Sequence, residues 1–122
     1  RALRCQRHPR RARPDAGCPL VAPLDQAERD ARGQIQTLPQ LPRIVAAQRR
    51  AATAEHCAFF DTFTAMGGND TMQRWFLSRP RLSFSDYRHA TPAGYRVIGN
   101  MLYKAILKGF ADYLSRVRPD AQ

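Results

Sequence analysis

Long hydrophobic segments are absent from this chain of 122 residues. No apolar run approaches the ~20 residues that a membrane-spanning helix needs, so we expect no membrane span. The N-terminus also lacks the apolar stretch of a signal peptide. Because 43% of the residues are nonetheless hydrophobic, the composition predicts a globular protein with a core of ordinary proportions for one domain. The residues themselves leave the compartment open.

Cysteine is scarce as well. The three cysteines, Cys5, Cys18 and Cys57, form no C-x-x-C pair and have no metal-ligand spacing with His8 or His56. This odd, sparse count predicts no disulfide framework. Because Cys18 and Cys57 each lead into an apolar run, we expect both to be buried free thiols. We expect neither a metal nor any other cofactor.

Lysine is nearly missing, since 2 Lys stand against 18 Arg, and the formal net charge is +10. Arginine pairs well with phosphate, so this charge favours a small basic protein that binds nucleic acid or another polyanion without catalysis. The distribution argues against that class, because six arginines fall within residues 1–13 and no basic helix face is interleaved with aromatic residues. We therefore expect no nucleic-acid partner and keep the basic binding protein as the alternative.

The same distribution suggests three parts of the chain. Residues 1–13 are too charged to bury a helix face and are broken by Pro9, so we expect a disordered N-terminal segment. Residues 14–118 form the expected domain. A polar tail follows at residues 119–122.

Asp86 and His89 stand three residues apart in the segment S-D-Y-R-H-A-T-P-A-G-Y. If the Asp86 carboxylate accepts a hydrogen bond from Nδ1 of His89, the imidazole keeps one tautomer and its Nε2 is free to take a proton. Thr91 suits an N-cap, Pro92 suits the first helical turn, and Gly94 allows close packing. The spacing predicts a general base on a loop before a helix, with a carboxylate oxygen about 2.6–3.2 Å from Nδ1. An ordinary charged surface loop is the alternative.

This block resembles the last block of the SGNH (GDSL-type) esterase family, D-x-x-H followed by a helix that opens with a turn residue, Pro and Gly. The stretches I-V-A-A-Q-R-R-A-A at 44–52 and A-F-F-D-T-F-T-A-M-G-G at 58–68 are similar to bacterial members, several of which act on acetylated cell-wall sugars. Where the family often has Pro after the His, this chain has Ala90. The resemblance implies a Ser-His-Asp hydrolase with Asp86 and His89 as catalytic residues. It also implies a small-molecule or carbohydrate ester as substrate and is compatible with a periplasmic or secreted location.

Two short apolar runs, at residues 18–22 and 57–60, predict β-strands, although Pro19 cannot donate to a ladder. Between the two runs, residues 24–38 are polar with scattered apolar positions. We expect a long connection there, with a helical turn at 26–31.

Three segments carry helical patterns. Apolar residues at helical spacing predict a helix over residues 42–55 and an amphipathic core helix over 92–108. Gly109 permits a break, after which residues 110–117 are expected to continue as a second, turn-rich helix. Residues 72–77 predict a short helix or lid whose large apolar side chains pack rather than bind ligand.

The resemblance implies an α/β fold, namely a flavodoxin-like three-layer α/β/α SGNH hydrolase domain. A five-stranded parallel sheet needs ~30 residues for each strand-helix-strand step, or ~150 or more in all. Only two strands are predicted here. We therefore expect the C-terminal part of such a domain, truncated.

The nucleophile and the oxyanion motif of a serine hydrolase do not occur here in the sequence context that the family gives them. The family's nucleophile lies in a G-D-S motif after the first strand, whereas Ser78, Ser83, Ser85 and Ser115 lie elsewhere. The G-G-N-D stretch at 67–70 matches the family's G-x-N-D oxyanion motif, but it lies too close to the His block, so we interpret it as a flexible loop beside the site. We expect this chain alone to be inactive and to need the missing N-terminal half of its domain.

Overall fold

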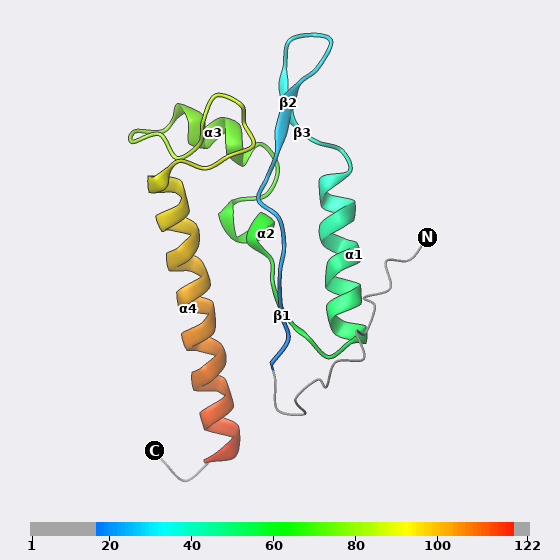
Figure 1. Cartoon of the computed structure of the whole chain (residues 1–122), viewed down its shortest axis with the longest axis vertical. Helices are drawn as coiled ribbons and strands as arrows, with labels where there is room; N and C mark the ends of the chain where they lie inside the picture. The colour runs from blue at the N-terminus through cyan, green and yellow to red at the C-terminus, as the bar shows by residue number, and fades with distance from the viewer. Residues whose placement is uncertain (1–16, 119–122) are drawn as a thin grey trace, which may run out of the picture.

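The structure, a computed structural model, describes residues 17–118. The basic segment 1–13 and the tail 119–122 lie outside the described residues. The elements follow in the order β1 (Pro19–Val21), β2 (Ala27–Arg29), β3 (Ile35–Thr37), α1 (Leu41–Ala54), β4 (Ala58–Phe60), α2 (Thr62–Met66), α3 (Thr71–Leu77) and α4 (Pro92–Val117). The described part is mixed α/β, with helices around two small sheets (Figure 1).

β1 and β4 form a parallel pair, in which Pro19 faces Ala58 and Val21 faces Phe60. Both strands lie in the apolar runs that predicted them. Pro19 is the first residue of β1, a position where its missing N–H is tolerated. Because parallel strands cannot be joined by a tight turn, the chain returns through the hairpin and α1.

A disulfide joins Cys18 to Cys57 at the start of this parallel pair. The prediction of buried free thiols and no disulfide was therefore wrong, and Cys18 is exposed while Cys57 is half-buried. The cause is nonlocal, because the pairing of the following strands brings the two Cα atoms to 4.8 Å across 39 residues of sequence. That separation lies in the range that a disulfide requires.

α1 confirms the helix predicted over residues 42–55. Its buried face carries Leu41 and Val45, which pack with Ala22 after β1 and Phe63 of α2. Phe59 of β4 packs against this first core cluster, which connects α1 to the parallel pair. Pro42 lies in the first turn, where no backbone N–H is needed.

Asp61 connects the exposed flank of α1 to the start of α2. Its carboxylate pairs with Arg49 and caps α2 by accepting the N–H of Thr64 at 2.9 Å. Burial raises the pKa of Asp61, but the hydrogen bonds from Thr64 and the pairing with Arg49 outweigh burial and hold that pKa below its usual value. The carboxylate therefore stays ionised at neutral pH.

A β-hairpin of β2 and β3 occupies the connection after β1, so the helical turn expected at 26–31 was wrong. Asp30 Oδ1 accepts the N–H groups of Arg32 at 2.9 Å and Gln34 at 2.8 Å. Gly33 adopts φ +81°, in the left-handed region. Side-chain bonds to the backbone compete with helical ones, and here they favour the turn.

α3 confirms the short helix expected over residues 72–77, and its large side chains pack as predicted. Met72 and Trp75 are buried with Met66 of α2 and Ala90 in a second core cluster. Partly buried apolar residues complete that cluster: Leu24, Leu82, Tyr87, Val97 and Ile98.

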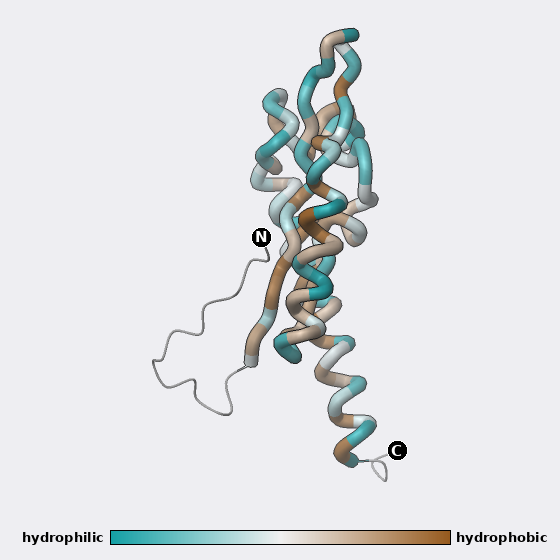
Figure 2. The backbone as a smooth tube through the Cα atoms, turned by 90° about the vertical axis from the view of Figure 1, so that its right-hand side faces the viewer, coloured by the Kyte–Doolittle hydropathy of each residue, from teal (hydrophilic) through white to brown (hydrophobic). Residues whose placement is uncertain are grey.

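α4 runs without interruption from Pro92 to Val117, so the break expected at Gly109 was wrong. Gly109 has open space around it and keeps helical geometry. The description of α4 as a core helix holds only near its start, because every residue from Tyr103 to Val117 is exposed. The C-terminal turns of α4 extend past the ends of β1 and α1 in both views (Figures 1 and 2).

Candidate active site

Asp86 and His89 lie together on the loop before α4. Oδ2 of Asp86 is 2.6 Å from Nδ1 of His89, which confirms the predicted geometry of the pair. The other ring nitrogen, Nε2, has no hydrogen-bond partner within residues 17–118, and 70% of the side chain of His89 is exposed. The imidazole is thus held at one nitrogen and open at the other.

The loop backbone holds the carboxylate of Asp86 in place. Its Oδ1 accepts the N–H groups of Arg88 at 3.0 Å and His89 at 3.1 Å, which leaves Oδ2 for the imidazole. This arrangement requires a sharp turn, and Tyr87 makes it with φ +54°, an uncommon conformation for a non-glycine residue. Both carboxylate oxygens are therefore used.

The start of α4 fixes the other end of the loop. Thr91 caps the helix by accepting the N–H of Gly94 at 3.2 Å and donates its own hydroxyl hydrogen to the carbonyl of Arg81 at 2.7 Å. Glycine is required at position 94, because a Cβ there would lie 2.0 Å from the carbonyl oxygen of Leu82. The Thr-Pro-x-Gly start thus brings the helix against the strand-like segment before the loop.

Contacts with other elements hold the loop from outside. The ring of Tyr87 packs edge-on against Phe76 of α3, with centroids 5.3 Å apart. Its carbonyl accepts the N–H of Ala27 of β2 at 2.9 Å. Arg88 pairs with Glu28 across 3.6 Å on the exposed side.

The charge of Asp86 is stabilised by these bonds. The hydrogen bond from His89, followed by that from the backbone of Arg88, lowers the pKa of the Asp86 carboxyl to about 2. The group is a carboxylate at neutral pH. It can therefore hold Nδ1–H of His89 and balance an imidazolium if Nε2 takes a proton.

Within residues 17–118, no serine is hydrogen-bonded to His89. Ser83 is buried and donates to the carbonyl of Met72 at 2.8 Å. The hydroxyl of Ser78 lies within hydrogen-bond distance of two backbone carbonyls, those of Trp75 and Pro80. Ser115 lies near the far end of α4 and bonds its own helix. The dyad geometry is present, but the described residues bring no nucleophile to it.

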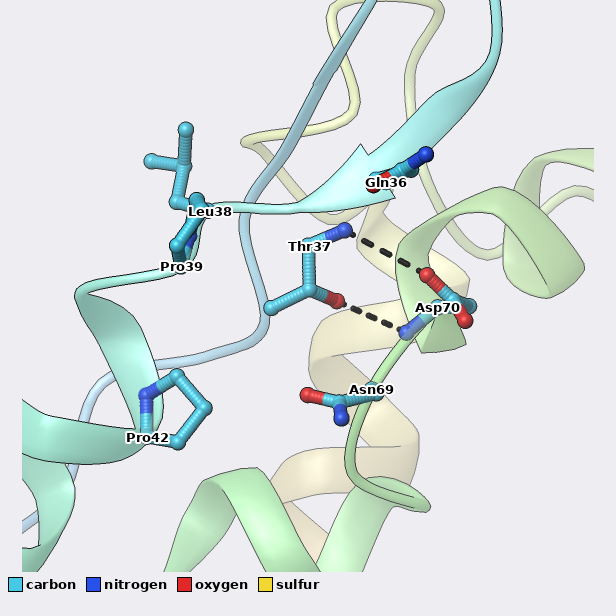
Figure 3. A pocket seen from close by; sticks show the side chains of 7 residues that line it. All are labelled: Gln36, Thr37, Leu38, Pro39, Pro42, Asn69 and Asp70. Atoms are coloured by element: carbon cyan, nitrogen blue, oxygen red, sulfur yellow. Dashed lines mark hydrogen bonds between the residues drawn. The ribbon is translucent and has the colours of Figure 1, made fainter. Parts of the chain in front are cut away.

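Asn69 lies in a different place from His89. It lines an open cavity of about 340 Å³ between the end of β3 and the start of α1, and neither Asp86 nor His89 lines that cavity (Figure 3). Two hydrogen bonds between Thr37 and Asp70, at 2.7 and 3.3 Å, fix one wall. Asn69 therefore faces a cavity to which the dyad does not contribute.

Two further features of the described residues bear on function. No group of three or more His, Cys, Asp or Glu side chains between residues 17 and 118 is arranged to hold a metal ion. In the same range, no helix combines the length and the apolar character needed to cross a membrane.

Comparison of the chain with protein-family models, with curated proteins and with solved structures finds no match. Functional inference therefore depends on the geometry of the described residues and on the motif resemblance.

Sequence reasoning missed one buried polar residue near the site. Asp25 has an exposed fraction of 0% and bonds Thr37 and the backbone of Met72. A signal was present, because a lone carboxylate that ends the apolar stretch P-L-V-A-P-L-D, three residues after a predicted strand, is unusual.

Proposed function

We propose that this chain is the C-terminal portion of a serine ester hydrolase of SGNH (GDSL) type, in which Asp86 and His89 supply the acid-base pair of a Ser-His-Asp triad. The observation that carries the proposal is the 2.6 Å contact between Oδ2 of Asp86 and Nδ1 of His89, with Nε2 left open. Unpaired surface histidines have no such orientation. The motif resemblance supplies the reaction class.

The position of the pair supports the proposal. β1 and β4 are parallel, and both run toward the end of the molecule where the loop between α3 and α4 lies (Figure 1). In open α/β sheets, ligands bind outside the carboxyl ends of the strands. A substrate at that end would reach Nε2 of His89.

The proposed chemistry assigns one step to each atom of the pair. Nε2 of His89 takes the hydroxyl proton of a serine as the serine oxygen bonds to the ester carbonyl carbon. The same nitrogen then gives the proton to the leaving alcohol oxygen when the ester bond breaks. Water repeats the two steps and releases the acid. Asp86 holds the tautomer and balances the imidazolium throughout.

The serine and the oxyanion donors would come from further strands and helices of the same sheet. Within the described residues β1 pairs only with β4, and parallel sheets are normally covered on both faces. The second half of α4 exposes an apolar stripe at helical spacing: Tyr103, Ile106, Leu107, Phe110, Tyr113, Leu114 and Val117. A surface of this kind fits against a missing N-terminal half, completing a flavodoxin-like three-layer α/β/α domain.

The disulfide bears on where such an enzyme would work. Disulfides persist mainly in oxidising compartments, so the bond between Cys18 and Cys57 supports a periplasmic or secreted esterase. A small-molecule or carbohydrate ester is the proposed substrate.

The test is an esterase assay on the chain joined to the product of its native upstream coding sequence, with a small activated acetyl ester as substrate. We expect turnover by the joined protein and none above background by the 122-residue chain. In the joined protein, His89→Ala should lower kcat by about 10⁴ or more, as in other triads.

His56→Ala is the matched control, because His56 is also an exposed histidine but lies just past the end of α1. It should leave kcat unchanged. Equal activity of the His89→Ala and wild-type proteins would refute the assignment of His89 as the general base.

A further inference from the structure

Asp25 is a buried carboxylate outside the Asp86–His89 pair. Its exposed fraction is 0%, and it is the one buried charged side chain among residues 17–118. Burying a carboxylate is costly unless its oxygens accept hydrogen bonds. The bonds that Asp25 accepts therefore indicate what it does in the fold.

Each oxygen of Asp25 holds a different segment. Oδ1 accepts the hydroxyl hydrogen of Thr37 at the end of β3, at 2.7 Å, and Oδ2 accepts the N–H of Met72 in the first turn of α3, at 2.9 Å. The hydroxyl of Thr37 in turn accepts the N–H of Asp70 at 2.7 Å. One carboxylate after β1 thus fixes β3 and the start of α3.

Met72 connects this network to the loop that carries His89. Its carbonyl accepts the hydroxyl hydrogen of buried Ser83 at 2.8 Å. Ser83 pairs with Ala90 in an isolated antiparallel bridge, and the next residue, Phe84, donates its N–H to the carbonyl of His89 at 2.9 Å. The two backbone groups of Met72 therefore have different partners. Its N–H bonds Asp25, and its carbonyl bonds Ser83, which pairs with the end of the loop that carries His89.

A second connection starts two residues after Asp25. The N–H of Ala27 donates to the carbonyl of Tyr87, which stands between Asp86 and His89 and has φ +54°. A backbone in that region persists only where its surroundings hold it. The segment 25–27 thus constrains the loop from two sides.

From this network we propose that Asp25 is a positioning residue for His89. Its carboxylate fixes the start of α3, and through Met72 and Ser83 it sets the direction in which the imidazole points. The consequence for catalysis rests on the proposed function, whereas the placement of His89 does not.

The test is an NMR measurement on the 122-residue chain that follows the Nδ1 proton of His89 and its exchange with water. Asp25→Ala should make that exchange about tenfold faster or more, the order expected when a buried hydrogen bond is lost. Asp25→Asn keeps one acceptor for the N–H of Met72 and should recover part of the protection. Amides of α1 serve as the internal reference.

Asp30→Ala is the matched control, because Asp30 is a half-buried carboxylate of the hairpin turn that also accepts backbone N–H groups. It should leave the exchange of the His89 proton unchanged. Equal exchange in the Asp25→Ala and wild-type chains, or an equal change in Asp30→Ala, would overturn the proposal.

If Asp25→Ala does not fold, the same exchange is compared between Thr37→Val and Thr37→Ser. Valine removes the hydroxyl that bonds Asp25, and serine keeps it, so only Thr37→Val should speed the exchange. The same effect in both variants would overturn the proposal. The readout needs no esterase turnover, so failure of the proposed function and failure of this inference are separate results.

Discussion

The two halves of α4 have very different surroundings. Near its start, Gly94 lies against the carbonyl of Leu82, and Val97 and Ile98 pack on the second core cluster. From Tyr103 onward every residue is exposed, including seven large apolar ones. The difference indicates that the start of α4 is held by the described residues, whereas within residues 17–118 nothing covers the apolar side chains of its second half.

Two charged pairs show the same contrast. Oδ2 of Asp86 lies 2.6 Å from Nδ1 of His89, and on α4 Oδ2 of Asp112 lies 2.7 Å from Nζ of Lys108. Their lengths are alike, but Asp86 also accepts two backbone N–H groups and so cannot rotate freely. Exposed i,i+4 pairs such as Lys108–Asp112 contribute little. What surrounds a pair, rather than its length, distinguishes a site from a surface contact.

The largest expected effect is on kcat, and it should differ between substitutions in these two pairs. In the protein joined to its upstream half, Asp86→Asn should lower kcat by about 10⁴, because an amide can hold the imidazole in the wrong tautomer. The measurement is the steady-state rate with an activated acetyl ester. Asp112→Asn removes the same charge from the other pair and should not change kcat. Similar losses in the two variants would contradict the distinction.

Substitutions in the apolar stripe give the next largest effect, and the size of their effect on stability depends on whether a partner surface is present. In the 122-residue chain, Phe110→Ser and Ile106→Ser should reduce the fluorescence of a bound hydrophobic dye and leave the free energy of unfolding within about 0.5 kcal/mol. In the joined protein, Phe110→Ser should destabilise by about 3–5 kcal/mol, as for a buried aromatic. Chemical denaturation of both proteins measures this.

Lys104→Ser is the matched control, since Lys104 lies on α4 but outside the apolar stripe. It should change neither dye binding nor stability appreciably in either protein. If Phe110→Ser is equally mild in the joined protein, the stripe is not covered there and the completed-domain proposal loses its structural support.

The smallest expected effect is a loss of stability at low pH. The folded-state pKa of Asp86 is about 2, below its usual value of 3.8. Because that pKa is lowered, the pairing contributes stability above pH ~4 and loses it as the pH falls through about 2. Nearly half of the side chain of Asp86 is exposed, so the contribution is small. A titration of the Asp86 carboxyl carbon by NMR should show this midpoint.

His89→Ala should raise that midpoint toward the usual value, because the hydrogen bond from His89 is the largest cause of the shift. His56→Ala should not move it. An unchanged midpoint in His89→Ala would mean that the backbone N–H groups alone hold the carboxylate.

Local features of the fold were predictable from the sequence. The helix over 42–55 and the start of α4 follow from apolar spacing and from the Thr-Pro-x-Gly signal. The contact of Asp86 with His89 spans three residues, so a turn and a helix start were enough to predict it.

The features that sequence reasoning missed depend on contacts between distant residues. The disulfide spans 39 residues and exists because two parallel strands bring its cysteines together. The bond from Met72 to Asp25 spans 47 residues, and no local pattern encodes it. The stripe on α4 has the spacing of a core face, but its burial depends on a surface that the described residues do not include.

The most direct test of the proposal is to label the joined protein with a fluorophosphonate, which reacts with activated serines, and to locate the label by mass spectrometry. We predict a label on a serine in a G-D-S sequence upstream of this chain, and its loss in His89→Ala. Labelling of Ser83 or Ser85, or labelling that persists in His89→Ala, would contradict the proposal that His89 activates a serine from the missing half.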